Sequence, residues 1–170
     1  SGINALLLSG GGQWGAYGAG FMERASESGS LPRPLIISGI STGSLQALFV
    51  GAHVSQPEAE WLAELTRQYS PQTESEIVDH GGMVAAITRG SIANITPLRR
   101  KIENALCSGL AAGETSRTGR TPPCPLIDAL AAEGPPVLIG FVEAESGDLL
   151  VVDAREIARD RALRLRVHRH

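Results

Sequence analysis

The segment Gly39-Ile40-Ser41-Thr42-Gly43 restricts the fold of this chain more than any other stretch. An apolar run at 35–38 comes before it, and helix-forming residues at 45–50 follow. Glycines on both sides of a serine let the backbone turn tightly between a strand and a helix, which pushes the serine hydroxyl clear of the main chain. A serine at this junction can also do no more than cap the helix. The segment therefore predicts a strand–turn–helix elbow, with Ser41 as either a nucleophile or a helix cap.

Strand-like and helix-like stretches alternate along the chain. Strands are predicted at 3–8, 35–38, 137–143 and 149–152, and helices at 15–28, 44–53, 58–69, 97–106 and 126–132. This alternation favours an α/β fold with a mainly parallel sheet. The length of 170 residues fits a single domain that spans 1–170. In such sheets functional residues gather at the carboxyl ends of the strands, where the first two predicted strands each lead into a glycine-rich segment.

Two segments depart from this alternation. Residues 107–125 are rich in Gly, Ser, Thr and Pro, and they predict a mobile loop. Cys107 and Cys124 bracket this loop; they would form a disulfide in an exported protein and would otherwise remain thiols. At 162–170, Leu and Val alternate with basic residues, a period-two pattern that is compatible with an edge strand.

Charge and composition exclude several classes of protein. The net charge of −3 argues against a nucleic-acid-binding domain, which usually carries a basic surface. Arginines are concentrated at the end of the chain, where they predict a solvated polar terminus or, less simply, a contact with anionic lipid; these are Arg155, Arg159, Arg161, Arg164, Arg166 and Arg169. No apolar run approaches the ~18 residues that a membrane-spanning helix needs. No Cys/His cluster has metal-ligand spacing, so we expect no structural zinc.

The first glycine cluster, Gly10-Gly11-Gly12, fits three kinds of site. With Gly15 it matches the GxGxxG spacing of a dinucleotide-binding turn, but that site needs an acidic residue at the end of the second strand, where Ser38 stands. A phosphate loop of the Walker type would need Gly-Lys-Ser or Gly-Lys-Thr, which is missing. An oxyanion hole remains, since glycine N–H groups in a tight loop leave room for a substrate carbonyl. Together with Ser41, this cluster favours an acyl-transfer site.

With both clusters in this order, the chain resembles the patatin-like lipid acyl hydrolases. The resemblance is carried by Leu6–Gly20, which includes Gly10-Gly11-Gly12-Gln13-Trp14-Gly15, and by Ile37–Leu45, which includes Gly39-Ile40-Ser41-Thr42-Gly43. It extends more loosely to Ser91-Ile92, to Pro97-Leu98-Arg99 and to the strand pair at 137–152. The chain is similar to bacterial members with Gln-Trp in the glycine loop. Many members have a basic residue where Trp14 stands.

The resemblance implies a three-layer α/β/α fold and hydrolysis of acyl esters in lipid or phospholipid substrates, which can lie at a membrane surface. It implies that Ser41 attacks the ester carbonyl and that Gly10, Gly11 and Gly12 donate N–H groups to the oxyanion. Gly15, Gly39 and Gly43 are the remaining motif glycines. No cofactor and no metal are implied. The family uses a Ser–Asp dyad, and its aspartate stands in an Asp-Gly-Gly or Asp-Gly-Ala turn downstream of the strand at 137–143.

That aspartate is missing from the expected place. None of the chain's aspartates, which are Asp79, Asp128, Asp148, Asp153 and Asp160, is followed by Gly-Gly or Gly-Ala. Asp79 comes too early, Asp148 fits a hairpin turn, and Asp153 fits a helix cap. We therefore expect the chain to be the N-terminal portion of a patatin-like domain.

Two other interpretations remain open. A Ser41–Asp–His168 order would match the α/β-hydrolases, although those folds place more strands before the elbow. His53 lies too far along the helix that follows Ser41 to reach its hydroxyl. Alternatively, the chain is a catalytically incomplete fragment or a non-catalytic lipid-binding domain, which has the pocket but no base.

Overall fold

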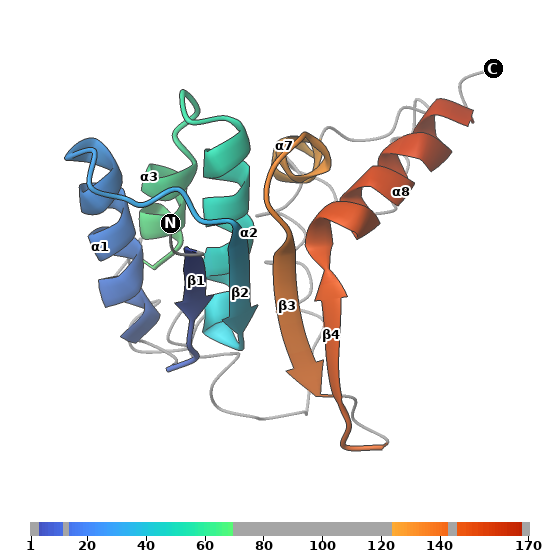
Figure 1. Cartoon of the computed structure of the whole chain (residues 1–170), viewed down its shortest axis with the longest axis horizontal. Coiled ribbons are helices and arrows are strands. Elements are labelled where there is room, and N and C mark those ends of the chain that lie inside the picture. Colours follow the sequence, from blue (N-terminus) through green and yellow to red (C-terminus); the bar gives the residue numbers. More distant parts are fainter. Residues whose placement is uncertain (1–3, 12–13, 70–123, 143–145, 168–170) are drawn as a thin grey trace, which may run out of the picture.

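The computed structural model of this chain describes residues 4–11, 14–69, 124–142 and 146–167. Helices and strands alternate through these residues (Figure 1). The elements in chain order are β1 (Ala5–Leu8), α1 (Gly15–Glu27), β2 (Ile36–Ile40), α2 (Thr42–Ser55), α3 (Trp61–Tyr69), α7 (Pro125–Ala131), β3 (Val137–Val142), β4 (Leu149–Asp153) and α8 (Ala154–Val167).

The described strands form one sheet of four in the order β1-β2-β3-β4. The first three strands are parallel, and β4 pairs with β3 in the antiparallel direction. Because β1 and β2 are parallel neighbours, with Leu8 opposite Gly39, their carboxyl ends lie at the same edge of the sheet. The segments that follow these two strands, at 9–11 and at 41, therefore begin side by side. The predicted α/β class and mainly parallel sheet are confirmed.

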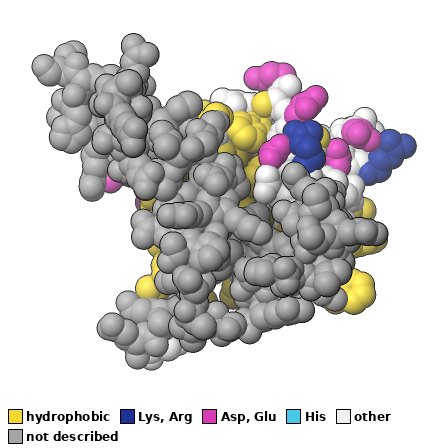
Figure 2. All heavy atoms as spheres, turned by 180° about the vertical axis from the view of Figure 1, so that it is seen from behind, with side chains coloured by type: hydrophobic (Ala, Val, Ile, Leu, Met, Phe, Trp, Pro, Cys, Tyr) yellow, Lys and Arg dark blue, Asp and Glu magenta, His cyan; other side chains and the backbone are white. Residues whose placement is uncertain are grey.

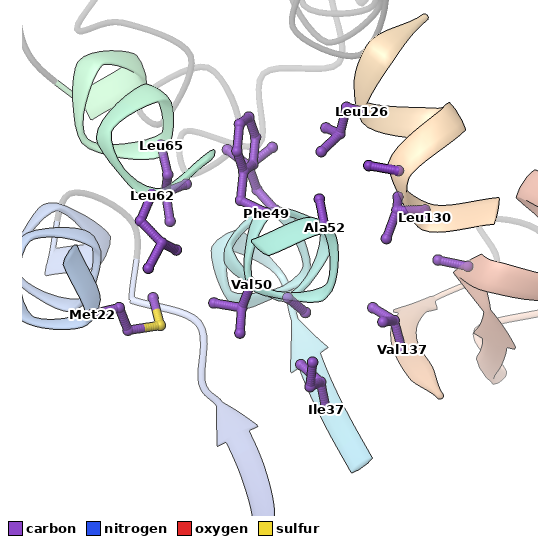
Figure 3. Close-up of a cluster of buried hydrophobic side chains, with 14 of the residues drawn as sticks. Met22, Ile37, Phe49, Val50, Ala52, Leu62, Leu65, Leu126, Leu130 and Val137 are labelled. Carbon is purple, nitrogen blue, oxygen red and sulfur yellow. The ribbon is translucent and has the colours of Figure 1, made fainter. Parts of the chain in front are cut away.

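Helix α2 lies at the centre of the core. It carries no acidic or basic side chain except His53, and nine of its residues are buried. A helix that is apolar on all sides is stable only when other elements surround it. Figure 3 shows how this is achieved, because side chains from α1, α3, α7, β2 and β3 surround α2. Phe49, Val50 and Ala52 of α2 are each 0 % exposed.

The opposite face of the sheet is not covered by any described helix (Figure 1). Alternate strand residues point to this face, and there Leu7 is 74 % and Val151 is 56 % exposed. The second helical layer that the resemblance implies is therefore not among the described elements.

The predicted elements agree with the structure except near the end of the chain. The four predicted strands and the helices expected at 15–28, 44–53, 58–69 and 126–132 are all present, with small changes in their bounds. The edge strand expected at 162–170 is wrong as far as the structure describes this segment, because α8 continues to Val167. The predicted helix at 97–106 and nearly all of the predicted loop at 107–125 lie outside the described residues. Cys107 does so too, whereas Cys124 is 5 % exposed and disulfide-bonded.

Helix α8 begins directly after Asp153, which caps it as predicted. The Asp153 Oδ1 atom accepts hydrogen bonds from the backbone N–H of Arg155 at 2.9 Å and of Val137 at 3.2 Å. An N-terminal cap of this kind satisfies N–H groups that have no partner within the helix. The helix that starts here continues into residues 162–167, where the alternation of residue types suggested a strand.

Arg155 is buried, which corrects the prediction of a solvated basic terminus for this residue. Its side chain is 1 % exposed, and its guanidinium donates to backbone carbonyls of α2, of the end of α7 and of the segment before β3. The acceptors are Gly51 at 2.7 Å, Leu130 at 3.0 Å, Ala132 at 3.2 Å and Pro135 at 2.5 Å. A cation is favourable here because the carbonyls at a helix C-terminus carry partial negative charge. Arg155 thus joins three elements that are far apart in the sequence.

Replacing Arg155 with Met should lower the free energy of unfolding by roughly 3 kcal/mol or more, because several buried carbonyls would lose their donor. The matched control is Arg159→Met. Arg159 donates longer bonds to Ala131 at 3.2 Å and Ala132 at 3.3 Å from a less buried position, so its loss should cost about 1 kcal/mol. Urea unfolding measures both variants, and equal losses would contradict the assigned role of Arg155.

His53 should make stability depend on pH. Its Nε2 lies 2.9 Å from the Ser26 hydroxyl of α1, and burial lowers its pKa from 6.5. As pH falls below 6.5, the unfolded chain therefore takes up the proton before the folded one, and this contribution to stability is lost. We expect His53→Gln to flatten the fall in the free energy of unfolding between about pH 7 and pH 5. An unchanged slope in urea titrations would count against this prediction.

Candidate functional site

Ser41 stands at the turn between β2 and α2 in a strained backbone conformation. Its φ is 56° and its ψ is −128°, and no other non-glycine residue in the described segments has a positive φ. Such a conformation costs about 1–3 kcal/mol and persists only where the surrounding structure holds it. Here the hydrogen-bonded strand β2 ends directly before Ser41 and the buried helix α2 starts at Thr42 directly after it. The serine is exposed, as the predicted strand–turn–helix elbow requires.

The two elbow glycines are required by backbone packing. A Cβ atom on Gly39 would collide with the carbonyl oxygen of Gly43, and a Cβ on Gly43 would collide with the carbonyl oxygen of Leu8. The elbow is therefore pressed against its own backbone and against the end of β1. Ser44 stabilises the turn, since its hydroxyl donates to the Gly39 carbonyl at 3.1 Å and its N–H to the Ser41 carbonyl at 2.9 Å.

Gly10 lies directly beside Ser41. A Cβ on Gly10 would stand 2.8 Å from the Ser41 Cβ and 3.3 Å from its Oγ, so no other residue fits here without a shift. Gly11 has a φ of 152°, which favours glycine, and its carbonyl accepts the Trp14 N–H at 3.1 Å. Gly12 lies outside the described residues. The structure thus brings Gly10 and the elbow together, although they are about 30 residues apart in the sequence.

Gly15 is a packing position at the start of α1. A Cβ there would approach the Tyr69 hydroxyl of α3 to 2.6 Å. The Gly15 carbonyl accepts a hydrogen bond of 2.8 Å from the buried side chain of Gln46 on α2. Sequence reasoning missed Gln46, although a single polar residue within the apolar segment Leu45-Gln46-Ala47 is a signal that could have found it. Through this bond, α2 fixes the helix that follows the glycine cluster.

No described carboxylate or histidine forms a hydrogen bond with the Ser41 hydroxyl. Asp153 lies two strands away and at the opposite end of the sheet, where it caps α8. Asp148 is at the same end as Ser41, but it belongs to the β3–β4 hairpin connection, about 10 Å to the side. His53 is near the far end of α2, about 18 Å along the helix axis from Ser41. Asp79 and His168 lie outside the described residues.

The described residues offer neither a metal site nor a membrane-spanning helix. They contain no group of three or more His, Cys, Asp or Glu side chains that could hold a metal ion. Nor does any described helix have both the length and the apolar character needed to cross a bilayer.

The contact between Gly43 and β1 yields a stability prediction. Gly43→Ala should lower the free energy of unfolding by about 2 kcal/mol or more, because the added methyl group meets rigid backbone rather than a flexible side chain. Gly20→Ala in α1 is the matched control, since its Cβ would meet nothing within 4 Å. That substitution should stabilise the chain by up to ~1 kcal/mol through helix propensity. Urea unfolding measures both variants. A Gly43→Ala chain as stable as the wild type would contradict the packing role of Gly43.

In a comparison with known protein families, the model of the patatin-like phospholipases matches residues 6–163 of the chain. No curated protein and no solved structure matches the chain.

Proposed function

The chain belongs to the patatin-like phospholipase family, and from this premise we propose that it hydrolyses acyl esters of lipids through a covalent acyl-enzyme on Ser41. The family as a whole consists of lipid acyl hydrolases. The observation that carries the proposal for this chain is the strained backbone of Ser41, with a φ of 56°, directly beside Gly10. Strain of this kind is characteristic of functional sites, because a serine that only caps a helix does not need it.

In the proposed reaction, the Ser41 Oγ attacks the carbonyl carbon of the ester, and negative charge develops on the carbonyl oxygen. The N–H groups of Gly10, Gly11 and Gly12 donate to that oxygen, and the N-terminus of α2 adds partial positive charge. The intermediate then expels the lipid alcohol, which takes a proton, and leaves the acyl group on Ser41. Water attacks this ester, releases the fatty acid and restores the serine.

The proton of Ser41 needs an acceptor, and this requirement separates two functions. A Ser–Asp dyad would supply a carboxylate, but no aspartate of this chain stands in an Asp-Gly-Gly or Asp-Gly-Ala turn. In the described part of the chain, no carboxylate bonds to Ser41 either. A second candidate function is that the chain binds lipid without turning it over, as it would if Ser41 had no such acceptor. Loss of one member of a catalytic unit typically lowers the rate by about 10⁴–10⁶-fold.

A fluorophosphonate probe tests the proposed nucleophile. We expect the probe to add its mass to the wild-type chain and to Ser44→Ala, but not to Ser41→Ala. Ser44 is the matched control because it lies three residues from Ser41 and, among the described residues, its hydroxyl bonds to the Gly39 carbonyl alone. A folded wild-type chain that stays unlabelled would contradict the acyl-enzyme mechanism.

Fatty-acid release separates the two candidate functions. Wild-type chain that releases fatty acid from phosphatidylcholine, with the release abolished in Ser41→Ala, would establish hydrolysis. Binding to the same lipid without release, in both chains alike, would establish the non-catalytic alternative.

A further inference from the structure

Aromatic residues are scarce in this chain, at 4 %, yet three of them stand exposed at the start and along one side of α1. Trp14 is 76 %, Tyr17 is 78 % and Phe21 is 62 % exposed. Their spacing of three and then four residues matches the 3.6-residue turn of a helix, so they share one side. We call these three residues the aromatic stripe.

The aromatic stripe is not needed for the packing of α1. That helix packs against α2 and α3 through a different set of residues, among which Ala19 is 0 %, Met22 is 2 % and Ala25 is 8 % exposed. Soluble proteins rarely leave several large apolar side chains together on the surface unless the patch binds something. The exposure of the stripe therefore indicates that it binds a partner outside the described fold.

The stripe begins at the candidate active site. The backbone N–H of Trp14 donates a hydrogen bond to the Gly11 carbonyl at 3.1 Å. A Cβ on Gly11 would lie 3.6 Å from the Trp14 Cβ. Gly10, the preceding residue, packs against Ser41. From Trp14 the stripe runs for about 10 Å along the helix, given a rise of 1.5 Å per residue. A partner on the stripe would thus cover the surface next to the Ser41 hydroxyl.

The chemistry of the stripe fits the surface of a lipid bilayer. Tryptophan and tyrosine combine an apolar ring with a polar group, and they are enriched at the depth where headgroups meet acyl chains. The nearest charged residue along this side, Arg24, is ion-paired with Glu27 at 2.8 Å, so the stripe ends in a neutral pair rather than a basic patch. Charged side chains of both signs also lie together on the face seen in Figure 2. A neutral headgroup suits this surface better than an anionic one.

We propose that the aromatic stripe inserts into the surface of a zwitterionic phosphatidylcholine bilayer and holds the Ser41 site against it. This inference rests on the proposed function, because the hydrolysis of lipid esters is the reason for the bilayer to lie next to Ser41. Binding of the stripe to the bilayer does not itself require that Ser41 hydrolyse the lipid. The failure of one proposal can therefore be told from the failure of the other.

Trp14 can report its own insertion. Trp61 is the only other tryptophan, and it packs edge-to-face on Phe49 with ring centroids 6.4 Å apart. Its indole nitrogen has no hydrogen-bond partner among the described residues, so Trp61→Phe removes no such bond and leaves Trp14 as the single fluorophore. In a Ser41→Ala, Trp61→Phe chain, vesicles of phosphatidylcholine brominated on the acyl chains should quench Trp14 fluorescence. Unchanged fluorescence with folded protein would overturn the proposal.

Vesicle flotation tests the rest of the stripe. Tyr17→Ala with Phe21→Ala should lower partitioning onto phosphatidylcholine vesicles by about tenfold or more, because two large apolar side chains no longer leave water. Phe141→Ala is the control, since Phe141 is also exposed, at 46 %, but lies on β3. It should change partitioning by less than about twofold. Alanine keeps the helix propensity of α1, and circular dichroism verifies the fold.

The remaining outcomes separate the two proposals. Vesicle binding without fluorophosphonate labelling would reject the acyl-enzyme mechanism and support the stripe. Labelling without vesicle binding would support the acyl-enzyme mechanism and reject the membrane contact of the stripe. Binding confined to anionic phosphatidylglycerol vesicles and lost in high salt would overturn the proposal, because it would mean a charge-driven contact. Self-association that the double variant abolishes, without vesicle binding, would also overturn it and assign the stripe to a second copy of the chain.

Discussion

The packing of one apolar helix into the middle of the molecule is the constraint on which the other features depend. Helix α2 is buried on all sides, and its first turn is pressed so closely onto the end of β1 that Gly43 has no room for a side chain. Burial of Phe49, Val50 and Ala52 stabilises the helix in this position. The backbone between β2 and α2 therefore has no freedom to relax. Ser41 adopts its strained conformation because both of its neighbours are fixed, and the burial of α2 offsets the cost.

Polar contacts hold α2 near both of its ends. Close to the first turn, Gln46 bonds to the Gly15 carbonyl and so connects α2 to the helix that follows the glycine cluster. Close to the last turn, the Gly51 carbonyl accepts from Arg155, which also bonds to the end of α7 and to the segment before β3. Both side chains are buried, and a buried polar group is costly unless it is bonded, so each of them selects one arrangement of the elements around it. The geometry at Ser41 is thus set by contacts across the whole described core.

The surface next to Ser41 is polar on one side and apolar on the other. On one side the glycine cluster offers backbone close to the serine hydroxyl, with Gly10 in direct contact. Beyond Gly11 the aromatic stripe begins, so polar backbone passes into apolar surface within a few residues. An ester in a lipid has the same division, with a polar carbonyl beside long acyl chains. The polar carbonyl of the lipid would therefore lie at the polar backbone beside Ser41, and its acyl chains would lie near the apolar stripe. This match physically connects the proposed reaction with the proposed membrane contact.

The sequence by itself determined the local geometry, and the tertiary structure decided which residues meet. Glycine has an unusual freedom of φ and no Cβ, so the elbow at 39–43 and the α/β alternation were predictable from residue types alone. The helix at 162–167 was not, because alternating Leu and Arg fit a strand as well as a helix. The helix forms where Asp153 caps it and where carbonyls of other elements accept from Arg155. Contacts of that kind join residues up to 104 positions apart, and no local pattern encodes them. For the same reason, only the folded chain brings Gly10 against Ser41 and leaves Trp14, Tyr17 and Phe21 exposed beside them.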